Sequence, residues 1–422
     1  MWRRGAARKK RVSRSPTQRA RDDGRAILRD ASPRDAFQSA LLRLMPALLL
    51  LLLLACGANT AAPPSPPTPP PPATTFAEVS TRLIRMFTDS ARANGVTGAQ
   101  LAISIPGHPM LTTEFGTEVP GMPMTADRLL GTGSISKMLA AVAALRLVDQ
   151  GKLSLTDTIG RWFPGVANVA GTIPLSRLLW HQSGLADYGS SPDYQGALLA
   201  NLQRSWAPEE LLPMIGPPAF PPGTSWAASN TDRLLLSIIS ARTSGMPYGE
   251  YVRRELFGGI EREVWTPGQS PALTPASHWG ATNAGVAASW DQFFGPALHT
   301  MRLETYVSAR TLVTFARRLF DGDLLSTQGR AVLLTIVQSD GRVPGETGGG
   351  VGLRRFGYFG RTSYGNSGAT SNSSAMYLYD PASKVIVSMN TNQAGGLHNN
   401  SHFNVVPALL QEASAFATRT GQ

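Results

Sequence analysis

The chain has 422 residues, of which 42% are hydrophobic and 16% are charged, so it can bury a large core and is not disordered throughout. A formal net charge of +11 would favour a nucleic-acid-binding protein if it were spread over the fold. Residues 1–55, however, hold 13 of the 39 Lys and Arg and only 4 of the 28 Asp and Glu, which leaves 26 basic against 24 acidic residues elsewhere. We therefore expect no nucleic-acid partner.

The N-terminal region predicts export and a lipid anchor. Arg43 precedes an apolar run, Leu44–Ala55, that ends at Cys56. As a helix this run would cover about 18 Å of a hydrocarbon core about 30 Å thick, so it is typical of a signal peptide rather than of a membrane-spanning helix. Leu53-Leu54-Ala55-Cys56 resembles a bacterial lipobox, in which the cysteine is lipidated and becomes the first mature residue. Because Cys56 is the only cysteine in the chain, an internal disulfide is excluded.

A Pro-rich stretch, Ala61–Thr75, follows the cysteine. Such a stretch is extended and semi-rigid, and it would hold a domain away from a membrane surface.

No internal repeat is visible, so solenoids and propellers are excluded. We predict a basic region with a signal peptide at 1–55, a linker at 56–75 and one globular domain at 76–422.

Within that domain, strands are predicted near both ends and helices in the middle. A helix is predicted from Phe76 to about Asn94. The predicted strands are Gln100–Ile105, Met110–Phe115, Ser374–Tyr379 and Val385–Met389. The later predicted helices are about Ser134–Asp149, Ala207–Ile215, Thr231–Thr243, Gly249–Leu256, Ser308–Phe320 and Val405–Ala417. This order predicts an α+β fold, with an antiparallel sheet built from both termini, flanking helices and a central helical lobe.

The residues that carry chemistry are Gly131-Thr132-Gly133-Ser134-Ile135-Ser136-Lys137, followed by the apolar stretch Met138–Val148. Residues three apart on a helix share a face, so the Ser134 hydroxyl and the Lys137 amine are expected within hydrogen-bonding distance. A neutral lysine can remove the serine proton, and both burial and the positive end of a helix disfavour the ammonium form. The same helix start offers the Ser134 N–H to a developing oxyanion.

Four segments carry a resemblance to a known family. In chain order they read MTADRLLGTGSISKMLAAVAALRLVDQGKLSLTDTIGRWFPG, LLWHQSGLADY, PPGTSWAASNTDRLLLSII and SYGNSGATSNSSAMYLYDP. Their order and spacing resemble class C β-lactamases, D-alanyl-D-alanine carboxypeptidases and related esterases over nearly all of the predicted domain. The resemblance implies a β-lactamase/transpeptidase-like fold, Ser134 as the acylated nucleophile and Lys137 as its proton-transfer partner, with no cofactor and no metal.

The second family motif is altered. Ala228-Ser229-Asn230 stands where the family usually reads Tyr-x-Asn, so Asn230 is carried over as a catalytic residue but the tyrosine is missing. In the family that phenol shares the acid/base work and protonates the leaving group. Because such groups contribute about 10²–10⁴-fold, Ala228 implies a slow or inert enzyme unless another residue acts. Tyr188, His181 and Asp232 are open as replacements.

The third motif, Lys-Thr-Gly or His-x-Gly in the family, is Asn366-Ser367-Gly368 here. The resemblance implies that these three residues bind substrate and that the N–H of Ala369 is the second oxyanion donor. Asn366 has no positive charge, so recognition of a substrate carboxylate is weakened unless Arg361 compensates, and neutral esters or amides are favoured over β-lactams. Glu346-Thr347-Gly348 shares more residues with Lys-Thr-Gly than Asn366-Ser367-Gly368 does. It lacks, however, the strand and Asp-Pro turn that follow the motif.

Other signals are set aside. His398 and His402 are four residues apart, but the polar residues between them and the preceding Gly pair favour a polar loop over a metal site. His181, in the HQSGLADY segment, is interpreted as structural. The glycine-dense run Gly348–Gly352 lacks the strand and helix of a nucleotide-binding loop and is interpreted as a loop.

The sequence therefore predicts a serine hydrolase that forms an acyl-enzyme on Ser134 with a D-Ala peptide, a β-lactam-like compound or a carboxylic ester. The alternative is a catalytically impaired pseudoenzyme that binds peptidoglycan fragments or a protein partner. The predicted partners are a small, peptidoglycan-derived substrate and, through the lipid on Cys56, a bacterial membrane on its periplasmic or exterior side. We expect a monomer.

Overall fold

The computed structural model describes residues 72–119, 121–267, 279–281, 287–289, 300–301, 303–339, 341, 343–370, 373–393 and 396–421. The predicted signal peptide, Cys56 and most of the predicted linker lie outside these residues, so the export and lipidation hypotheses stay predictions. Among the described helices, none combines the length and the apolar character that crossing a membrane requires.

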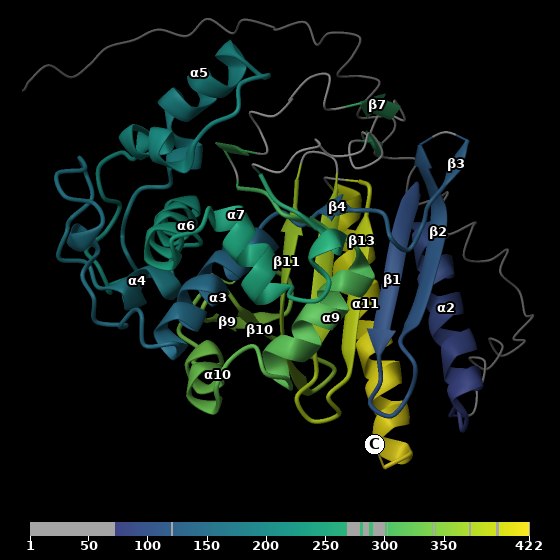
Figure 1. Ribbon diagram of the computed structural model, residues 1–422. Coiled ribbons are helices and arrows are strands. Elements are labelled where there is room, and N and C mark those ends of the chain that lie inside the picture. The colour runs from purple at the N-terminus through teal and green to yellow at the C-terminus, as the bar shows by residue number, and fades with distance from the viewer. Residues whose placement is uncertain are drawn as a thin grey trace, which may run out of the picture. The chain divides into compact units, whose positions relative to one another are not determined.

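Among the described residues, an antiparallel sheet of eight strands has the order β3-β2-β1-β13-β12-β11-β10-β9 (Figure 1). The strands are β1 (Gly98–Ser104), β2 (Leu111–Val119), β3 (Met122–Pro123), β9 (Glu346–Gly349), β10 (Arg354–Tyr358), β11 (Arg361–Ala369), β12 (Ser374–Tyr379) and β13 (Ile386–Thr391). β1 pairs directly with β13, with Leu101 opposite Met389. The strands that are far apart in sequence thus form one sheet, as the α+β prediction requires.

Helices cover both faces of this sheet. On one face, α2 (Phe76–Ala93) and α11 (Gly396–Arg419) pack against each other and against the strands. On the other face, α9 (Ala309–Phe320) contacts β1 and β13, and α3 (Ile135–Asp149) contacts β11. The helix that begins directly after Ser134, α3, therefore lies on the sheet.

The strands supply both layers because side chains alternate between the two faces. On β1, Leu101 belongs to the apolar cluster under α2 and α11, whereas Ala102 belongs to the cluster around α3. On β12, Met376 belongs to the cluster under α2 and α11, and Tyr377 belongs to the cluster around α3. Burial on both faces explains why these strands read as nearly continuous apolar runs.

The section between the two halves of the sheet is largely helical. Its helices are α4 (Leu175–Leu179), α5 (Pro192–Ala200), α6 (Asn230–Ser244), α7 (Tyr248–Tyr251) and, later in the chain, α10 (Thr327–Leu333). Short turns of other helix types are η1 (Ile159–Arg161), η2 (Tyr188–Ser190), η3 (Pro208–Met214), η4 (Val252–Leu256) and η5 (Glu261–Glu263). The short strands are β4 (Leu130–Gly131), β5 (Val264–Trp265), β6 (Trp279–Ala281), β7 (Ala287–Ser289) and β8 (Tyr306–Val307).

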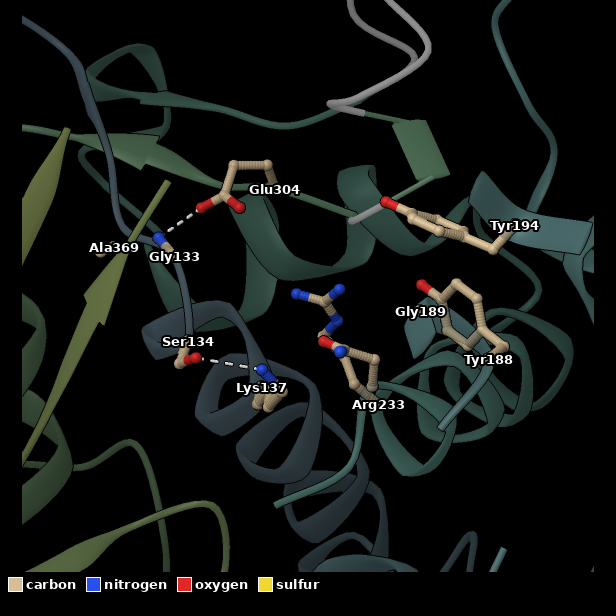
Figure 2. Close-up of a pocket in the computed structure, with 10 residues that line it drawn as sticks. Gly133, Ser134, Lys137, Tyr188, Gly189, Tyr194, Arg233, Glu304 and Ala369 are labelled. Atoms are coloured by element: carbon tan, nitrogen blue, oxygen red, sulfur yellow. Dashed lines mark hydrogen bonds between the residues drawn. The ribbon is translucent and has the colours of Figure 1, made fainter. Parts of the chain in front are cut away.

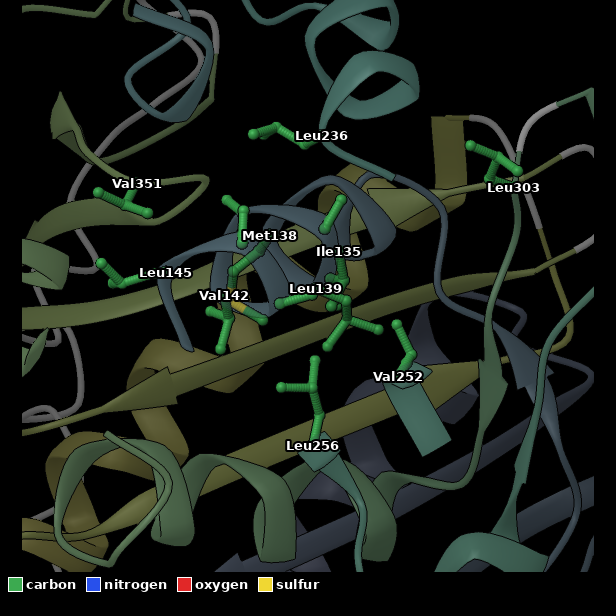
Figure 3. Packing of buried hydrophobic residues seen from close by; sticks show 14 of the residues in the cluster. Ile135, Met138, Leu139, Val142, Leu145, Leu236, Val252, Leu256, Leu303 and Val351 are labelled. Carbon is green, nitrogen blue, oxygen red and sulfur yellow. The ribbon is translucent and has the colours of Figure 1, made fainter. Parts of the chain in front are cut away.

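α3 lies in the middle of the larger apolar cluster. Its side chains are apolar on nearly every side, which is typical of a buried helix rather than an amphipathic one. Figure 3 shows Met138, Leu139 and Val142 packed among side chains of neighbouring elements, including Leu236 of α6 and Leu256 of η4. This packing holds the start of the helix, where the chemistry is predicted, in one position.

The final helix begins earlier than the sequence predicts. α11 starts at Gly396 rather than near Val405, so the predicted polar loop around His402 is wrong. The His402 ring is buried, and its Nε2 lies 3.1 Å from the carbonyl oxygen of Met389. This tertiary contact, together with burial of Phe403, outweighs the low helix propensity of the polar and glycine residues.

Two central helices also differ from prediction. The predicted helix Ala207–Ile215 is the 3₁₀ helix η3, which contains Pro213. Proline lacks the N–H that an α-helix interior needs. The predicted helix Gly249–Leu256 is divided into α7 and a turn of π-helix, η4.

The packing of α3 predicts a large stability effect. Leu139 is fully buried, so Leu139→Ala should lower the free energy of unfolding by about 2–5 kcal/mol, because the cavity adds to the lost transfer energy. Leu199→Ala is the matched control, since Leu199 is 70% exposed on α5. Chemical unfolding of both variants measures the difference. Equal midpoints for the two would contradict the proposed central place of α3.

Candidate active site

Ser134 lies at a sharp junction between a strand and a helix. β4 ends at Gly131, and α3 begins at Ile135 with Ser134 as its N-cap residue. Gly133 makes the turn with φ +55°, in the left-handed region that glycine adopts without strain. The Ser134 hydroxyl makes no capping hydrogen bond, so it remains available for another partner.

That partner is Lys137. Its Nζ lies 3.0 Å from the Oγ of Ser134, on the helical face that the two residues share (Figure 2). Both side chains are only partly buried, so a ligand can reach them. The pair has the geometry of a nucleophile and its base.

A second segment, next to β8, clamps this junction. The Glu304 carboxylate accepts hydrogen bonds from the N–H of Gly133 and, at 3.3 Å, from the hydroxyl of Ser136. The N–H of Thr305 donates to the Ser136 hydroxyl at 3.1 Å, and the Thr132 hydroxyl donates to the Thr305 carbonyl at 2.9 Å. The backbone before Ser134 is therefore held on one side by buried hydrogen bonds.

On its other side, the junction touches the end of β11, backbone against backbone. A methyl carbon on Gly368 would lie 2.3 Å from the nitrogen of Ser134 and 2.1 Å from the oxygen of Thr132. A methyl carbon on Gly133 would lie 2.3 Å from the nitrogen of Ala369. Only glycine permits this approach, and it places the backbone nitrogens of Ser134 and Ala369 near each other. Two N–H groups so placed are what an oxyanion requires.

Two cavities meet at Ser134 and Lys137. The larger has a volume of about 220 Å³. It is lined by Gly133, Ser134, Lys137, Tyr188, Gly189, Tyr194, Asn230, Arg233, Glu304 and Ala369. Asn230 is fixed there because its Nδ2 donates to both carboxylate oxygens of Asp187, at 3.1 and 3.0 Å. The structure thus brings the predicted nucleophile, base, asparagine and oxyanion donors to one cavity.

The smaller cavity has a volume of about 20 Å³, enough for one water molecule. It is lined by Ser134, Lys137, His181, Trp226, Ala228, Gly352, Arg354 and Asn366. Asn366 is buried there, and its Nδ2 donates to the carbonyl oxygen of Gly352 at 2.6 Å.

The protein-family model described as Beta-lactamase matches residues 83–405. The matched range contains every residue that lines the two cavities. The chain belongs to the β-lactamase family.

Members of the β-lactamase family include penicillin-binding proteins. The chain is 28% identical to penicillin-binding protein 4 of Amycolatopsis lactamdurans over 341 residues, which is 75% of this chain and 86% of that protein. It is 30% identical to penicillin-binding protein 4* of Bacillus subtilis over 158 residues, which is 35% of this chain. That second alignment spans only 33% of the Bacillus protein, about a third of its length.

Solved structures support the same fold. The D-amino acid amidase of Ochrobactrum anthropi SV3, complexed with L-phenylalanine, has a TM-score of 0.69 at 23% identity, and the match covers 82% of this chain and 99% of the amidase. The chain thus has the β-lactamase/transpeptidase-like fold, as predicted, and belongs to a family of serine hydrolases that act on amides and esters.

In this β-lactamase family member, Ala228 stands at the position of the motif tyrosine. Its side chain borders the smaller cavity. Tyr188 is not a ready substitute. Its hydroxyl donates to the carbonyl oxygen of Met301 at 2.5 Å, and burial raises its pKa to about 12. A phenol in that state is protonated at neutral pH and is already committed as a donor.

His181 and Asp232 form a buried pair at the smaller cavity. The Nδ1 of His181 lies 3.2 Å from the Oδ2 of Asp232, and the ring also packs edge-on against Trp226. Burial raises the pKa of the Asp232 carboxyl, and the hydrogen bond from His181 opposes that shift. Because Nδ1 faces Asp232, Nε2 is the nitrogen left for the cavity.

Arg361 does not supply the positive charge that Asn366 lacks. The Arg361 side chain, at the first residue of β11, pairs with Asp380 at 3.0 Å, so that hypothesis is wrong. Arg354 of β10 borders the smaller cavity instead and is ion-paired with Glu346.

The glycine-dense run is only partly a loop. Gly348 and Gly349 belong to β9, at the edge of the sheet, and are therefore strand residues. Gly350, by contrast, lies between β9 and β10. The rejected anchor Glu346-Thr347-Gly348 is on this same edge strand, with β10 between it and β11.

Sequence reasoning missed Arg233, Glu304 and Arg354. A signal existed for Arg233, because it lies three residues after Asn230 and so shares its helical face. Nothing local marks Glu304 or Arg354, since each reaches the site from an element that is distant in sequence.

The contact between β11 and α3 gives a prediction for Gly368→Ala. The added methyl must push the Ala369 N–H away from Ser134, so reactivity of Ser134 should fall about 10²–10³-fold, the usual effect of losing one oxyanion donor. Gly196→Ala is the control, because nothing lies within 4 Å of its added methyl. The rate of covalent labelling measures the effect. Equal rates for the two variants would contradict it.

Proposed function

We propose that the chain is an active serine hydrolase that cleaves small amides or esters through an acyl-enzyme on Ser134. The observation that carries this proposal is the 3.0 Å contact between the Nζ of Lys137 and the Oγ of Ser134, at a cavity that also receives the backbone of Ala369. A nucleophile, a base and two oxyanion donors are the minimum for acyl transfer.

In the first step, neutral Lys137 takes the proton of Ser134, and Oγ attacks the substrate carbonyl carbon. The carbonyl oxygen becomes an oxyanion between the N–H groups of Ser134 and Ala369. The bond to the leaving group then breaks as that group receives a proton. In the second step, a water molecule gives a proton to the neutral amine of Lys137 and attacks the acyl carbon, which releases the acid and returns the proton to Ser134.

The proton for the leaving group comes, in this proposal, from His181. Asp232 holds the Nδ1 side of the His181 ring, which leaves Nε2 to pass a proton, and the cavity between His181 and Ser134 has room for one water. After donation, protonated Lys137 restores the proton to His181 through that water. In this proposal, His181, Asp232 and the water take over the role of the motif tyrosine, which is alanine at position 228.

The size of the larger cavity, about 220 Å³, favours a small acyl group. The names of the relatives and of the similar structure, penicillin-binding proteins and a D-amino acid amidase, support amides built on D-amino acids as the first class to test. A peptidoglycan-derived substrate and a lipid anchor at Cys56 are part of the same proposal, and they would place the domain at a bacterial envelope.

The alternative, a pseudoenzyme that only binds peptidoglycan fragments or a protein partner, rests on the changes at Ala228 and Asn366. It predicts that Ser134 does not react, so the next experiment separates the two.

We expect a fluorophosphonate probe to label the full-length chain on the peptide that contains Ser134, as read by mass spectrometry. Ser134→Ala should abolish the label, and Lys137→Met should slow labelling about 10²–10⁴-fold, since it removes the base. Ser154→Ala, at an exposed serine, is the control. A wild-type chain labelled no faster than Ser134→Ala would overturn the proposed hydrolase and favour the pseudoenzyme.

We expect His181→Asn to lower amide turnover selectively. Asparagine tolerates the positive φ of this position, 55°, and can still donate to Asp232, but it lacks a second nitrogen for the cavity. A para-nitroanilide needs a proton on its leaving amine, whereas a para-nitrophenyl ester of the same acid does not. The ratio of amide to ester turnover should therefore fall about 10²-fold or more.

A purely structural His181 would lower both activities together. Equal loss on the two substrates, or no loss, would show that His181 is not the proton donor.

A further inference from the structure

A buried arginine faces the larger cavity. Arg233 lies in the first turn of α6, three residues after Asn230, and is only 2% exposed. Figure 2 shows its guanidinium projecting into the space between Tyr188 and the Ser134–Lys137 pair. The position of this charge beside the reactive groups calls for a partner.

Among the described residues, the Arg233 guanidinium has few hydrogen-bond partners. Nε and Nη2 of Arg233 are buried with no hydrogen-bond partner there, although the side chain also interacts with the Tyr188 hydroxyl. These two nitrogens form one edge of the guanidinium, with the spacing of the two oxygens of a carboxylate. This unpaired edge matches the two oxygens of one carboxylate, and because both nitrogens are enclosed, a ligand in the cavity must shift the Arg233 side chain to reach them.

Nearby acidic groups are engaged elsewhere in the part of the chain that the structure describes. Glu304 lines the same cavity, but its Oε1 accepts from the N–H of Gly133 (Figure 2) and from the hydroxyl of Ser136. Asp232, next in sequence, faces His181. A buried cation without a carboxylate partner is costly to the fold, and an anionic ligand would compensate that cost.

We propose that Arg233 binds a carboxylate of the substrate, so that the enzyme prefers anionic amides or esters whose carboxylate lies a few bonds from the scissile carbonyl. This inference rests on the proposed hydrolase function and names its substrate class. It also revises the expectation drawn from Asn366. The strand that usually bears the cation has none at that position, but the helix on the other side of the nucleophile bears one.

The test compares two esters of equal leaving group and similar length, mono-para-nitrophenyl glutarate, which carries a carboxylate, and para-nitrophenyl valerate, which does not. We expect the wild-type chain to have the higher kcat/KM on the glutarate ester. In Arg233→Met, the ratio of the two kcat/KM values should fall about 10- to 100-fold, the usual size of a hydrogen-bonded charge contact, and mostly through KM. Arg242→Met, on the exposed part of α6, should leave the ratio unchanged.

Folding is checked separately. Arg233→Met removes an unpaired buried charge, so its unfolding temperature should stay level or rise, and fluorophosphonate should still label Ser134. An unchanged ester ratio in Arg233→Met would overturn the inference while leaving the hydrolase proposal in place.

A second measurement does not depend on turnover. Calorimetric titration of glutarate into Ser134→Ala, with and without Arg233→Met, reports the anion site directly. Binding that Arg233→Met weakens about 10-fold or more supports the inference even if the chain proves inert as a hydrolase. Binding that is absent, or that does not depend on Arg233, overturns it.

Discussion

The close approach of two backbones, at Gly133 and Gly368, is the constraint on which the site depends. It brings the end of β11 against the start of α3, so that the backbone nitrogens of Ala369 and Ser134 lie close together at the edge of the larger cavity. The position of α3 is set by apolar packing along its whole length, and the position of β11 by its neighbours in the sheet. The reactive geometry is therefore a consequence of where two large elements meet.

The charged groups around this point lie on several different elements. Lys137 belongs to α3, Arg233 to α6 and Glu304 to the segment before β8. Each is held in partly or fully buried surroundings, where an electrostatic interaction is stronger than in water. The chain lacks the motif tyrosine and the strand cation, yet these charged groups and the buried His181–Asp232 pair border the cavities that meet at Ser134 and Lys137.

Much of the fold could be predicted because its signals are local. The apolar stretch after Lys137 predicted a buried helix, and β12 has the predicted bounds, Ser374–Tyr379. Prediction failed where tertiary contacts outweighed local preference. The start of α11 looks polar in sequence, yet burial of His402 makes it helical.

The sequence by itself determined the family, the nucleophile candidate and its neighbour, because Ser134 and Lys137 are three residues apart and any helix would bring them together. It also determined that the motif phenol and the strand cation were missing. Only the tertiary structure decided which groups surround that pair. His181, Arg233 and Glu304 come from separate segments, and their distances from Ser134 follow from the packing of helices on the sheet, which no local spacing encodes.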